Sequence, residues 1–418
     1  MIALVDVNNF YVSCERLFNP KFLNKPVIVL SNNDGCVISR SNEAKLLGIK
    51  MGTPLFKIKN IIESSNITVL SSNYALYGDL SNRAMALLRP YSNQQEVYSI
   101  DECFLDLSGT QGLFTIGQNI QKQLWQYLGM PVCVGIAPTK TLAKLANFCA
   151  KKQPKWSGVF DLSGISNTRI ESIMREINVA EVWGVGSKTA NKLKLIGVNS
   201  VLDLKKSNAI YIKKKFSINL EKIIYELNGT ICSPIDVRAP LKKQIISSRS
   251  FGHPIRKYNL LVEAVTTFAS IAAFKSRKQG TLAEYVTVFI SSSPFKETSH
   301  FYQNNVTLKL PYPTSDLKLI LSMALQGVRI IYKADIAYVK CGIILSGLMD
   351  SSRAQEYLWP TKNIKQSQLT QVIDDINFKF DKHSLRLATQ PINPVWGMRQ
   401  SRKSQSFTTS WDDLLLVN

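Results

Sequence analysis

Two adjacent carboxylates stand in the stretch Tyr98-Ser99-Ile100-Asp101-Glu102-Cys103-Phe104-Leu105-Asp106-Leu107, between short apolar segments. This pattern predicts a hairpin over about residues 96–107 whose tip is the acidic pair. Neighbouring side chains of a strand point to opposite faces, so a tip is what lets both carboxylates leave the sheet together. Asp-Glu is a poor tight turn, since such turns favour Asn-Gly or Asp-Gly. A conflict of this kind is expected where function overrides local preference, although an isolated acidic pair is usually an exposed turn.

A third carboxylate interrupts the first apolar run of the chain. Residues 1–7 (MIALVDV) predict a strand that is apolar except for Asp6. Burying such an acid costs several kcal/mol unless it is paired or bound to a cation. Three carboxylates at strand ends suit one or two Mg²⁺ ions, which prefer oxygen ligands and share them with phosphates. The spacing alone does not show that Asp6 meets Asp101.

The charge of the chain is unevenly distributed. The 418 residues carry a net charge of +21, with 45% hydrophobic and 19% charged residues, and the length predicts two to four domains. Residues 1–110 hold 10 Lys and Arg against 10 Asp and Glu, whereas 111–240 hold 18 against 8 and 241–340 hold 14 against 5. A neutral segment with an acid cluster, followed by a basic one, suits a polyanion that passes a metal site. A generic basic surface is the alternative.

Other classes of protein are disfavoured by the same composition. The seven cysteines show no CxxC spacing, so neither a zinc site nor a disulfide framework is expected. No signal peptide precedes the first strand, and no run of about eighteen apolar residues is present. We expect a soluble, cytoplasmic protein with no membrane contact.

Strands and helices alternate irregularly, as in a multidomain α/β and α+β protein. In the first half we expect strands at 27–30, 36–39 and 131–137 and a helix over 113–128. Over 139–152 apolar residues recur at helical spacing, and Lys140, Lys144 and Lys151 are expected on a basic face, either solvated or bound to phosphate. The second half predicts helices at 259–278 and 315–332 and strands at 285–291, 306–310 and 338–345. The tail from 346 shows no period and suggests linker material with peptide motifs.

A Gly-x-Gly turn lies within residues 179–204, which predict a helix-hairpin-helix unit. Gly184 and Gly186 would let backbone N–H groups and the start of the second helix approach a phosphate, with Lys188 and Lys192 on that helix. Contacts of this type position DNA without reading its sequence. An ordinary helical corner is the alternative.

Several of these stretches together resemble the Y-family DNA polymerases of the UmuC type, the catalytic subunit of bacterial DNA polymerase V or a mobile-element homologue. The resemblance covers nearly the whole chain and rests on residues 5–15 (VDVNNFYVSCE), 41–52 (SNEAKLLGIKMG), 99–102 (SIDE), 134–144 (VGIAPTKTLAK), 248–252 (SRSFG) and 409–415 (TSWDDLL). It implies a right-hand polymerase. Its parts would be palm and fingers in 1–165 (fingers about 20–75), a helical thumb in 166–238, a DNA-binding βα little finger in 239–346 and a tail in 347–418.

The resemblance also implies roles for single residues. Asp6, Asp101 and Glu102 match the catalytic carboxylates and, with the Val7 carbonyl, the ligands of two Mg²⁺ ions. Tyr11 matches the steric gate, whose ring excludes a ribose 2′-hydroxyl.

Further matches concern the triphosphate, DNA and a sliding clamp. Asn42 and Lys45 stand where the family commonly has Tyr and Arg, and Lys lacks the bidentate contact of Arg, so weaker triphosphate binding is expected. The remaining residues assigned by resemblance are Phe10 and Lys151 for the triphosphate, Arg249 for DNA, and Gln355, Leu358 and Trp359 for the clamp, where Glu356 replaces the usual leucine.

The expected function is error-prone, template-directed addition of dNTPs to a primer end opposite damaged bases in SOS mutagenesis (EC 2.7.7.7). The resemblance implies primer-template DNA, dNTP, a sliding clamp, a UmuD′-like dimer and RecA as partners. A non-catalytic DNA-binding adaptor that recruits clamp or RecA is the main alternative. A palm-type nucleotide cyclase is a weaker one, because it has no use for a helix-hairpin-helix.

Overall fold

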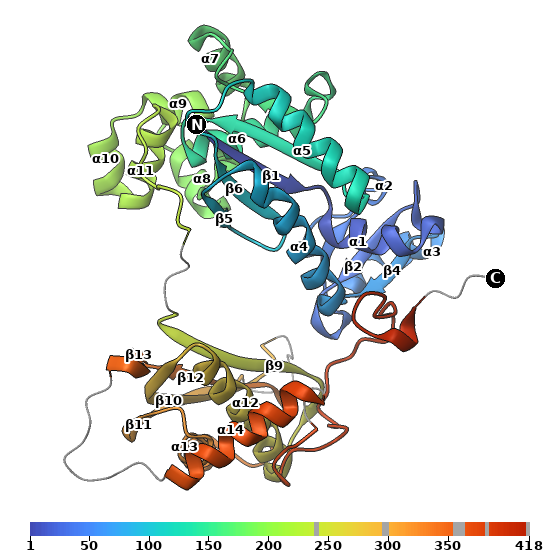
Figure 1. Ribbon diagram of the computed structural model, residues 1–418, viewed down its shortest axis with the longest axis vertical. Coiled ribbons are helices and arrows are strands. Elements are labelled where there is room, and N and C mark those ends of the chain that lie inside the picture. Colours follow the sequence, from blue (N-terminus) through green and yellow to red (C-terminus); the bar gives the residue numbers. More distant parts are fainter. Residues whose placement is uncertain (238–241, 295–300, 354–363, 381–383, 415–418) are drawn as a thin grey trace. The chain divides into compact units, whose positions relative to one another are not determined.

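The computed structural model describes residues 1–237, 242–294, 301–353, 364–380 and 384–414, with no description of the side chains of Pro154, Arg353 and residues 364–367. The chain divides into two compact units (Figure 1). Unit 1 comprises Met1–Ser31, Gly35–Ala239 and Arg402–Asn418, and unit 2 comprises Asn32–Asp34 and Pro240–Ser401. The chain therefore contributes three residues to unit 2 at Asn32–Asp34, returns to unit 1, forms the rest of unit 2 from Pro240 to Ser401, and returns to unit 1 at Arg402.

A five-stranded sheet forms the centre of unit 1. Its order is β5-β6-β1-β7-β8, with β1 antiparallel to both β6 and β7, β5 antiparallel to β6, and β7 parallel to β8. The strands are β1 (Ile2–Val7), β5 (Gln95–Val97), β6 (Glu102–Asp106), β7 (Val132–Ala137) and β8 (Val159–Asp161). The first apolar run of the chain thus becomes the middle strand, as its burial on both faces requires.

The two faces of this sheet support separate cores. Leu4 and Phe104 point into a core with α6 (Lys140–Lys152), whereas Ala3 and Leu105 point into a core with α1 (Phe10–Phe18), α4 (Tyr74–Leu88) and α5 (Leu113–Leu128). Side chains alternate along a strand. The even-numbered residues of β1 and β6, which include Asp6 and Glu102, therefore share the face that α6 covers.

Gly135 lets α6 lie directly against β7. A Cβ atom at this position would stand 2.2 Å from the backbone nitrogen of Asn147 and 2.4 Å from the carbonyl oxygen of Ala143. Both atoms belong to the backbone of α6 and have no room to move. The lysines of α6 are thereby held close to the end of β1.

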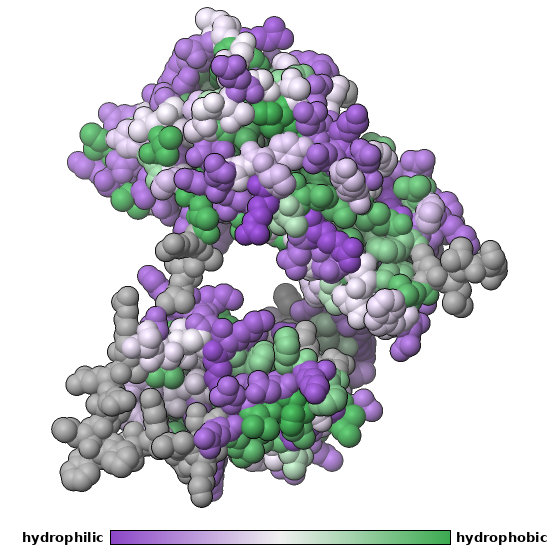
Figure 2. Space-filling model, viewed as in Figure 1, coloured by the Kyte–Doolittle hydropathy of each residue, from purple (hydrophilic) through white to green (hydrophobic). Residues whose placement is uncertain are grey.

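A small sheet of order β3-β2-β4 belongs to the same unit. It consists of β2 (Val27–Leu30), β3 (Val37–Arg40) and β4 (Thr68–Ser71), with β2 antiparallel to β3 and parallel to β4. Two short helices accompany it, α2 (Asn42–Leu46) and α3 (Lys59–Ser64). Figure 2 shows hydrophobic residues gathered on the visible face around β2, β4 and α1. Leu46, Met51 and Phe56 are among the exposed apolar residues of this region.

Among the described residues of unit 1, five α-helices follow β8. They are α7 (Asn167–Glu176), α8 (Ser187–Lys194), α9 (Val201–Lys206), α10 (Ala209–Lys215) and α11 (Ile218–Leu227). Glu226, which is buried, joins α11 to the start of α6: its carboxylate accepts hydrogen bonds from the N–H and hydroxyl of Thr141, and its carbonyl accepts from the Thr139 hydroxyl. The helices and the sheet therefore share one core.

Unit 2 is an antiparallel sheet with helices packed against it. Its strand order is β11-β10-β12-β9, and the apolar side chains of α12 and α13 form one core with the sheet. The elements are β9 (Gln244–Ile255), α12 (Tyr258–Lys278), β10 (Thr281–Ser292), β11 (Gln303–Thr314), α13 (Leu317–Ile331), β12 (Tyr338–Ser346), β13 (Met349–Asp350) and α14 (Ile364–Lys379). The helices and strands predicted for residues 259–345 are confirmed, with longer strands than expected.

The prediction of a two-residue hairpin tip is wrong. The loop between β5 and β6 spans residues 98–101, and Glu102 is already the first residue of β6. The Ser99 hydroxyl accepts hydrogen bonds from the N–H groups of Asp101 and Glu102, so a serine closes the turn. A four-residue loop removes the misfit that the pair Asp-Glu would cause in a tighter turn.

The prediction that the tail is linker material is also wrong for much of its length. Asp374 on α14 makes a bidentate ion pair with Arg277 of α12 at 2.6 and 2.9 Å. Trp396, only 6% exposed, packs near Phe251 and Phe268 in the core of unit 2. Isolated aromatic residues without a period give no local signal of such packing.

Candidate active site

Strand pairing brings the three carboxylates predicted from the sequence to one end of the sheet. Asp6 of β1 lies directly opposite Glu102 of β6. The N–H of Val7 donates to the carbonyl of Asp101 at 2.9 Å, which holds the loop against the end of β1. The question that spacing left open is answered, because Asp6 and Asp101 lie close together.

Lysines of α6 neutralise two of these acids. Lys151 Nζ lies 2.5 Å from Asp6 Oδ2, and Lys144 Nζ lies 3.0 and 2.9 Å from the two oxygens of Glu102. The carboxylate of Asp101 instead accepts from the Ser99 hydroxyl at 2.6 Å. The basic face predicted for α6 is therefore not a solvated one, since its lysines pair with acids of the sheet.

Lys140, the first lysine of α6, is buried. It pairs with Glu96 and donates to the carbonyl of Pro234 at 2.8 Å. This lysine lies at the start of the helix, remote from Asp6 along α6. It therefore joins β5, α6 and the chain after α11 within unit 1.

The surroundings of Asp6 disfavour its ionised form. Burial raises the pKa of Asp6 to about 6, against the opposing effect of Lys151, and the charges of Glu102 and Asp101 add to the increase. A buried carboxyl group whose ionisation is disfavoured by two neighbouring carboxylates is a typical preparation for a cation.

The donor set fits a hard divalent cation in its chemistry. Carboxylate oxygens are the ligands that Mg²⁺ prefers. Within the residues that the structure describes, however, no group of three or more His, Cys, Asp or Glu side chains is already arranged around a common point as metal ligands. The lysine ammonium groups hold oxygens that an ion would need, so binding requires them to be displaced.

Tyr11 lies on the opposite side of β1, on the second residue of α1. Its ring stacks on that of Tyr77 with centroids 4.5 Å apart and an interplanar angle of 17°, and it meets the edge of Tyr74 at 6.2 Å. Burial raises the pKa of Tyr11, and the charge of Asp101 contributes. The ring is half-buried, and Asp101 is near enough for its charge to act on the hydroxyl. The helix begins after Asn9, whose φ of 50° is left-handed.

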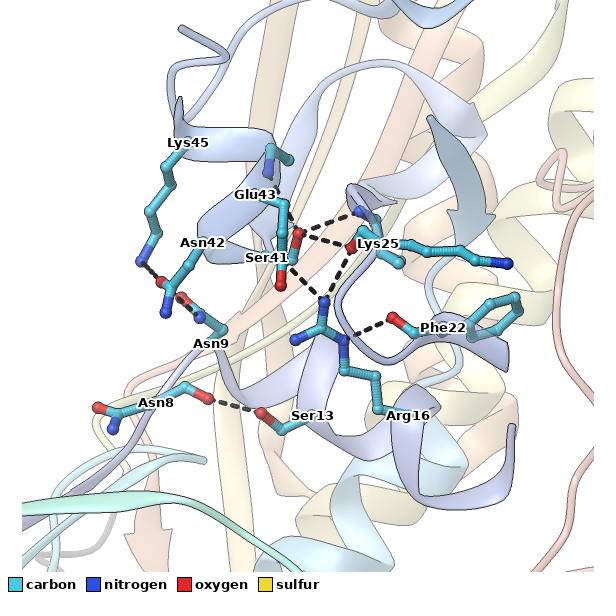
Figure 3. Close-up of polar contacts among 12 residues, drawn as sticks. Asn8, Asn9, Ser13, Arg16, Phe22, Lys25, Ser41, Asn42, Glu43 and Lys45 are labelled. Carbon is cyan, nitrogen blue, oxygen red and sulfur yellow. Dashed lines mark hydrogen bonds and ion pairs between the residues drawn. The ribbon is translucent and has the colours of Figure 1, made fainter. Parts of the chain in front are cut away.

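The predicted triphosphate residues of α2 lie beside the start of α1 (Figure 3). The Asn42 carboxamide oxygen accepts from Asn9 Nδ2 at 3.1 Å and from Lys45 Nζ at 3.2 Å. Burial lowers the pKa of Lys45, with further contributions from Arg40, Lys151 and Lys152. The side chain of Phe10 is 3% exposed and packs in the core, so only its backbone is available to a phosphate.

Arg40 is a candidate that the sequence analysis missed. It ends β3 two residues before Asn42, and its charge acts on Lys45. Among the described residues, its Nε and Nη1 atoms are buried and have no hydrogen-bond partner. Unpaired buried donors of a guanidinium are costly and suit an anion that binds later. A basic residue at a strand end next to the 41–52 motif was the available signal.

Aromatic residues surround Lys144. Its ammonium lies 4.4 Å from the Tyr98 ring centroid and 5.3 Å from that of Trp183. The Trp183 indole N–H donates to the Tyr98 hydroxyl at 3.2 Å. The segment before the Gly-x-Gly turn is thereby joined to the loop that carries Asp101.

The Gly-x-Gly turn is followed by an α-helix but is not directly preceded by one. A 3₁₀ turn, η6 (Val179–Glu181), precedes it, and α8 starts after Gly186 with no side chain capping its first turn. The prediction of a helix on both sides is therefore corrected. Gly184 has a φ of +85°, which favours glycine. Lys188 and Lys192 are exposed on α8.

The other predicted nucleic-acid residue lies in unit 2. Arg249 is exposed on β9, and its charge, with that of Lys242, adds to burial in lowering the pKa of Lys275. These three cations therefore form one positive group. The predicted clamp residues Gln355, Leu358 and Trp359 lie outside the described residues.

Comparison with known proteins gives three family matches along the chain. Residues 5–147 match the impB/mucB/samB family, residues 242–358 its C-terminal domain, and residues 367–417 a domain of unknown function. Protein ImpB of Salmonella typhimurium is 40% identical over 100% of this chain and 99% of its own length. Protein UmuC of the same species is 39% identical over 100% of both chains.

The chain belongs to the UmuC-type Y-family DNA polymerases. A solved Y-family DNA polymerase chimera of Dbh and Dpo4 shares its fold, with a TM-score of 0.65 at 23% identity over 84% of this chain and 100% of the other. This UmuC-type chain is an error-prone translesion DNA polymerase with a mixed α/β fold and a little-finger domain. The polymerase prediction is thus confirmed over the adaptor and cyclase alternatives. None of the described helices is long and apolar enough to cross a bilayer.

Proposed function

We propose that the end of β1 is the site at which this UmuC-type polymerase adds a dNTP to a primer 3′ end on a DNA template. Asp6, Asp101 and Glu102 are proposed as the catalytic carboxylates and, with the Val7 carbonyl, as holders of two Mg²⁺ ions. The observation that carries the proposal is the pairing of Asp6 with Glu102 across the sheet, with Asp101 held beside Val7. Bound there, the ions would activate the primer hydroxyl and neutralise the leaving pyrophosphate.

The residues around the carboxylates bind and orient the nucleotide in this proposal. Lys151 is displaced from Asp6 and then contacts a phosphate, so its positive charge remains in the site. Arg40, Lys45 and Asn42 hold the rest of the triphosphate, and the unpaired N–H groups of Arg40 supply the directional donors that Lys45 lacks. The backbone of Phe10, at the start of α1, supplies a further donor.

Sugar selection is assigned to Tyr11. Its ring is fixed on one side by Tyr77 and meets Tyr74 by its edge. A planar ring held in this way rejects a single added 2′-oxygen by shape. Because the structure of the ring, and not a polar contact, makes the selection, the selectivity is expected to fall when the side chain is shortened.

DNA contacts are assigned to both units. In unit 1 the uncapped start of α8, with Gly184, Gly186, Lys188 and Lys192, would bind backbone phosphate. In unit 2 the positive group around Arg249 would do the same. We keep the division into palm and fingers (1–165), thumb (166–238), little finger (239–346) and tail (347–418) as part of this proposal.

Partners beyond DNA and dNTP also remain proposals. They are a sliding clamp bound through Gln355, Leu358 and Trp359, a UmuD′-like dimer and RecA, and the proposed place of action is the nucleoid in the cytoplasm. Their support is the full-length similarity to Protein UmuC. Comparing extension on damaged templates with and without each partner tests them one at a time.

Primer extension tests the catalytic site. The double variant Asp101→Ala, Glu102→Ala should lose extension in Mg²⁺, because the site would retain one carboxylate of three. The matched control is Asp106→Asn, which neutralises an acid at the other end of β6. The proposal fails if the double variant, folded as judged by circular dichroism, still extends a primer.

A further inference from the structure

The segment Arg402–Phe407, which belongs to unit 1, packs against the N-terminal part of that unit. The N–H of Ser71 donates to the Arg402 carbonyl at 2.9 Å, and the N–H of Arg402 donates to the Ser71 hydroxyl at 3.0 Å. Ser71 also forms a parallel β-bridge with Lys403. The segment thus adds itself to β4, an edge strand of the small sheet (Figure 1). It lies within the matched domain of unknown function.

Side chains fix the segment more firmly than the short bridge. Asn73, the N-cap of α4, is buried, and its amide donates to the Ser404 carbonyl at 3.3 Å, the Ser404 hydroxyl at 3.0 Å and the Gln405 carbonyl at 3.1 Å. The Phe407 ring stacks on that of Phe18 in α1, with centroids 4.7 Å apart and planes at 10°. The segment therefore joins α1 to the start of α4.

Glu15 is the residue that makes this docking specific. Its side chain is buried at 1% exposure in α1. Its Oε1 atom accepts from the Tyr77 hydroxyl at 2.6 Å and from the Ser404 hydroxyl at 3.0 Å. Burial raises the pKa of Glu15, and the two hydroxyls oppose that increase. One of the two donors of a buried acid thus comes from a residue 389 positions away.

Tyr77 links this acid to the proposed steric gate. It is fully buried on α4, its hydroxyl is held by Glu15, and its ring stacks on Tyr11. Four side chains in contact therefore run from the end of the chain to the nucleotide site: Ser404, Glu15, Tyr77 and Tyr11. Reactive sites need their groups held within about 0.5 Å, which takes supporting hydrogen bonds and packing of this kind.

We propose that the segment Arg402–Phe407 is a positioning element for sugar selection, with Ser404 as its positioning residue. By holding Glu15 and, through it, the Tyr77 hydroxyl, it fixes the plane on which the Tyr11 ring rests. The inference rests on the proposed role of Tyr11 as the steric gate. It assigns to the end of this polymerase a part in choosing deoxynucleotides.

The test measures sugar selectivity, the ratio of kcat/KM for dNTP to that for the matching rNTP, in the full-length enzyme. Ser404→Ala should lower the ratio about three- to tenfold, the effect of removing one hydrogen bond of ordinary strength. Ser404→Thr keeps the hydroxyl and should restore the ratio. The matched control is Ser410→Ala, which removes a hydroxyl three residues beyond the segment that makes no cap hydrogen bond. A ratio in Ser404→Ala equal to that of the control overturns the proposal.

Tyr77→Phe removes the hydroxyl that donates to Glu15 but keeps the ring that stacks on Tyr11. It should lower the selectivity in the same direction, so the proposal can be judged even where Ser404→Ala folds poorly. An unchanged ratio in folded Tyr77→Phe overturns the proposal.

Combining Ser404→Ala with Tyr11→Ala separates a positioning role of Ser404 from general damage to the fold. In Tyr11→Ala the gate is gone, so adding Ser404→Ala should leave the ratio where Tyr11→Ala put it. A further fall in the double variant counts against the path through Tyr11. If Tyr11→Ala alone leaves the ratio at the wild-type value, the gate assignment and this inference fail together. If only Tyr11→Ala changes it, the gate stands and this inference falls.

Discussion

Asp6 and Glu15 are both carboxyl groups buried in unit 1, but their partners differ in charge. Asp6 pairs with Lys151, whose side chain is 35% exposed, whereas Glu15 accepts from two neutral hydroxyls, of Tyr77 and Ser404. A partly exposed lysine can leave an acid and remain solvated. Hydroxyls packed in a core have no such alternative. The comparison therefore distinguishes Asp6, whose partner Lys151 can be exchanged for another cation, from Glu15, whose two partners stay in place.

Replacing Asp6 by Asn tests the proposed catalytic role of Asp6 and has the largest expected effect. The variant should lower kcat of primer extension by about a thousandfold or more, since the loss of the proposed metal contact would remove several kcal/mol of transition-state stabilisation. Stability without Mg²⁺ should not fall, because the amide keeps the shape of the side chain and Lys151 can turn to water. Extension assays and thermal unfolding in EDTA measure the two effects.

Asp161→Asn, at the end of β8 in the same sheet, is the matched control for this prediction, and it should extend primers as the wild type does. Residual extension by Asp6→Asn at more than a tenth of the wild-type rate would show that the acid is structural, like Glu15.

Gly135→Ala tests whether the backbone of α6 must lie against the sheet for the acid–lysine pairs to form. The new Cβ would overlap two backbone atoms of α6. We expect a loss of about 1–3 kcal/mol or more in the free energy of unfolding, as for other overpacked cores. Gly78→Ala on α4 is the control, because a Cβ there meets nothing within 4 Å. Urea denaturation compares them, and equal stabilities would contradict the close approach.

Arg40→Ala tests whether the exchangeable site includes an anion-binding part. Because two N–H groups of Arg40 have no acceptor among the described residues, we expect them to contact triphosphate. KM for dNTP should rise about tenfold with kcat changed less, as for a lost charge-assisted hydrogen bond. The control is Arg83→Ala, which breaks an exposed ion pair with Asp79. An unchanged KM would assign Arg40 a structural role.

The position of Asp6 and one of the helices of unit 1 could be predicted from the sequence. An acid inside an apolar run singles out Asp6, and helical spacing gave α5 with both its bounds. The partners of the acids were not predicted. Lys144 and Lys151 were expected on one basic face, but spacing along a helix does not tell which strand the helix will cover.

The burial of Glu15 and its hydrogen-bond partners were not predicted. Glu15 lies on a helix among buried residues, and its partner Ser404 comes from a stretch with no period. A contact across 389 residues leaves no local pattern, because it depends on where the chain returns after unit 2. Arg40 was missed for a related reason: that its N–H groups have no partner is a property of its surroundings.

The pH dependence of stability is the smallest expected effect and separates the two acids further. Burial raises the pKa of Glu15 above its ordinary value of 4.5 in the folded protein. The folded state then binds this proton more tightly than the unfolded state. The contribution of Glu15 to stability is therefore full below pH 4.5 and is lost as the pH rises through the raised pKa.

Glu15→Gln keeps an oxygen that accepts from Tyr77 and Ser404 but does not titrate. The free energy of unfolding of this variant should therefore gain on that of the wild type as the pH rises from 4.5 towards 7. Urea denaturation of both proteins at several pH values measures the difference. A constant difference over this range would mean that Glu15 has its ordinary pKa, which is incompatible with an acid sealed in place by the returning end of the chain.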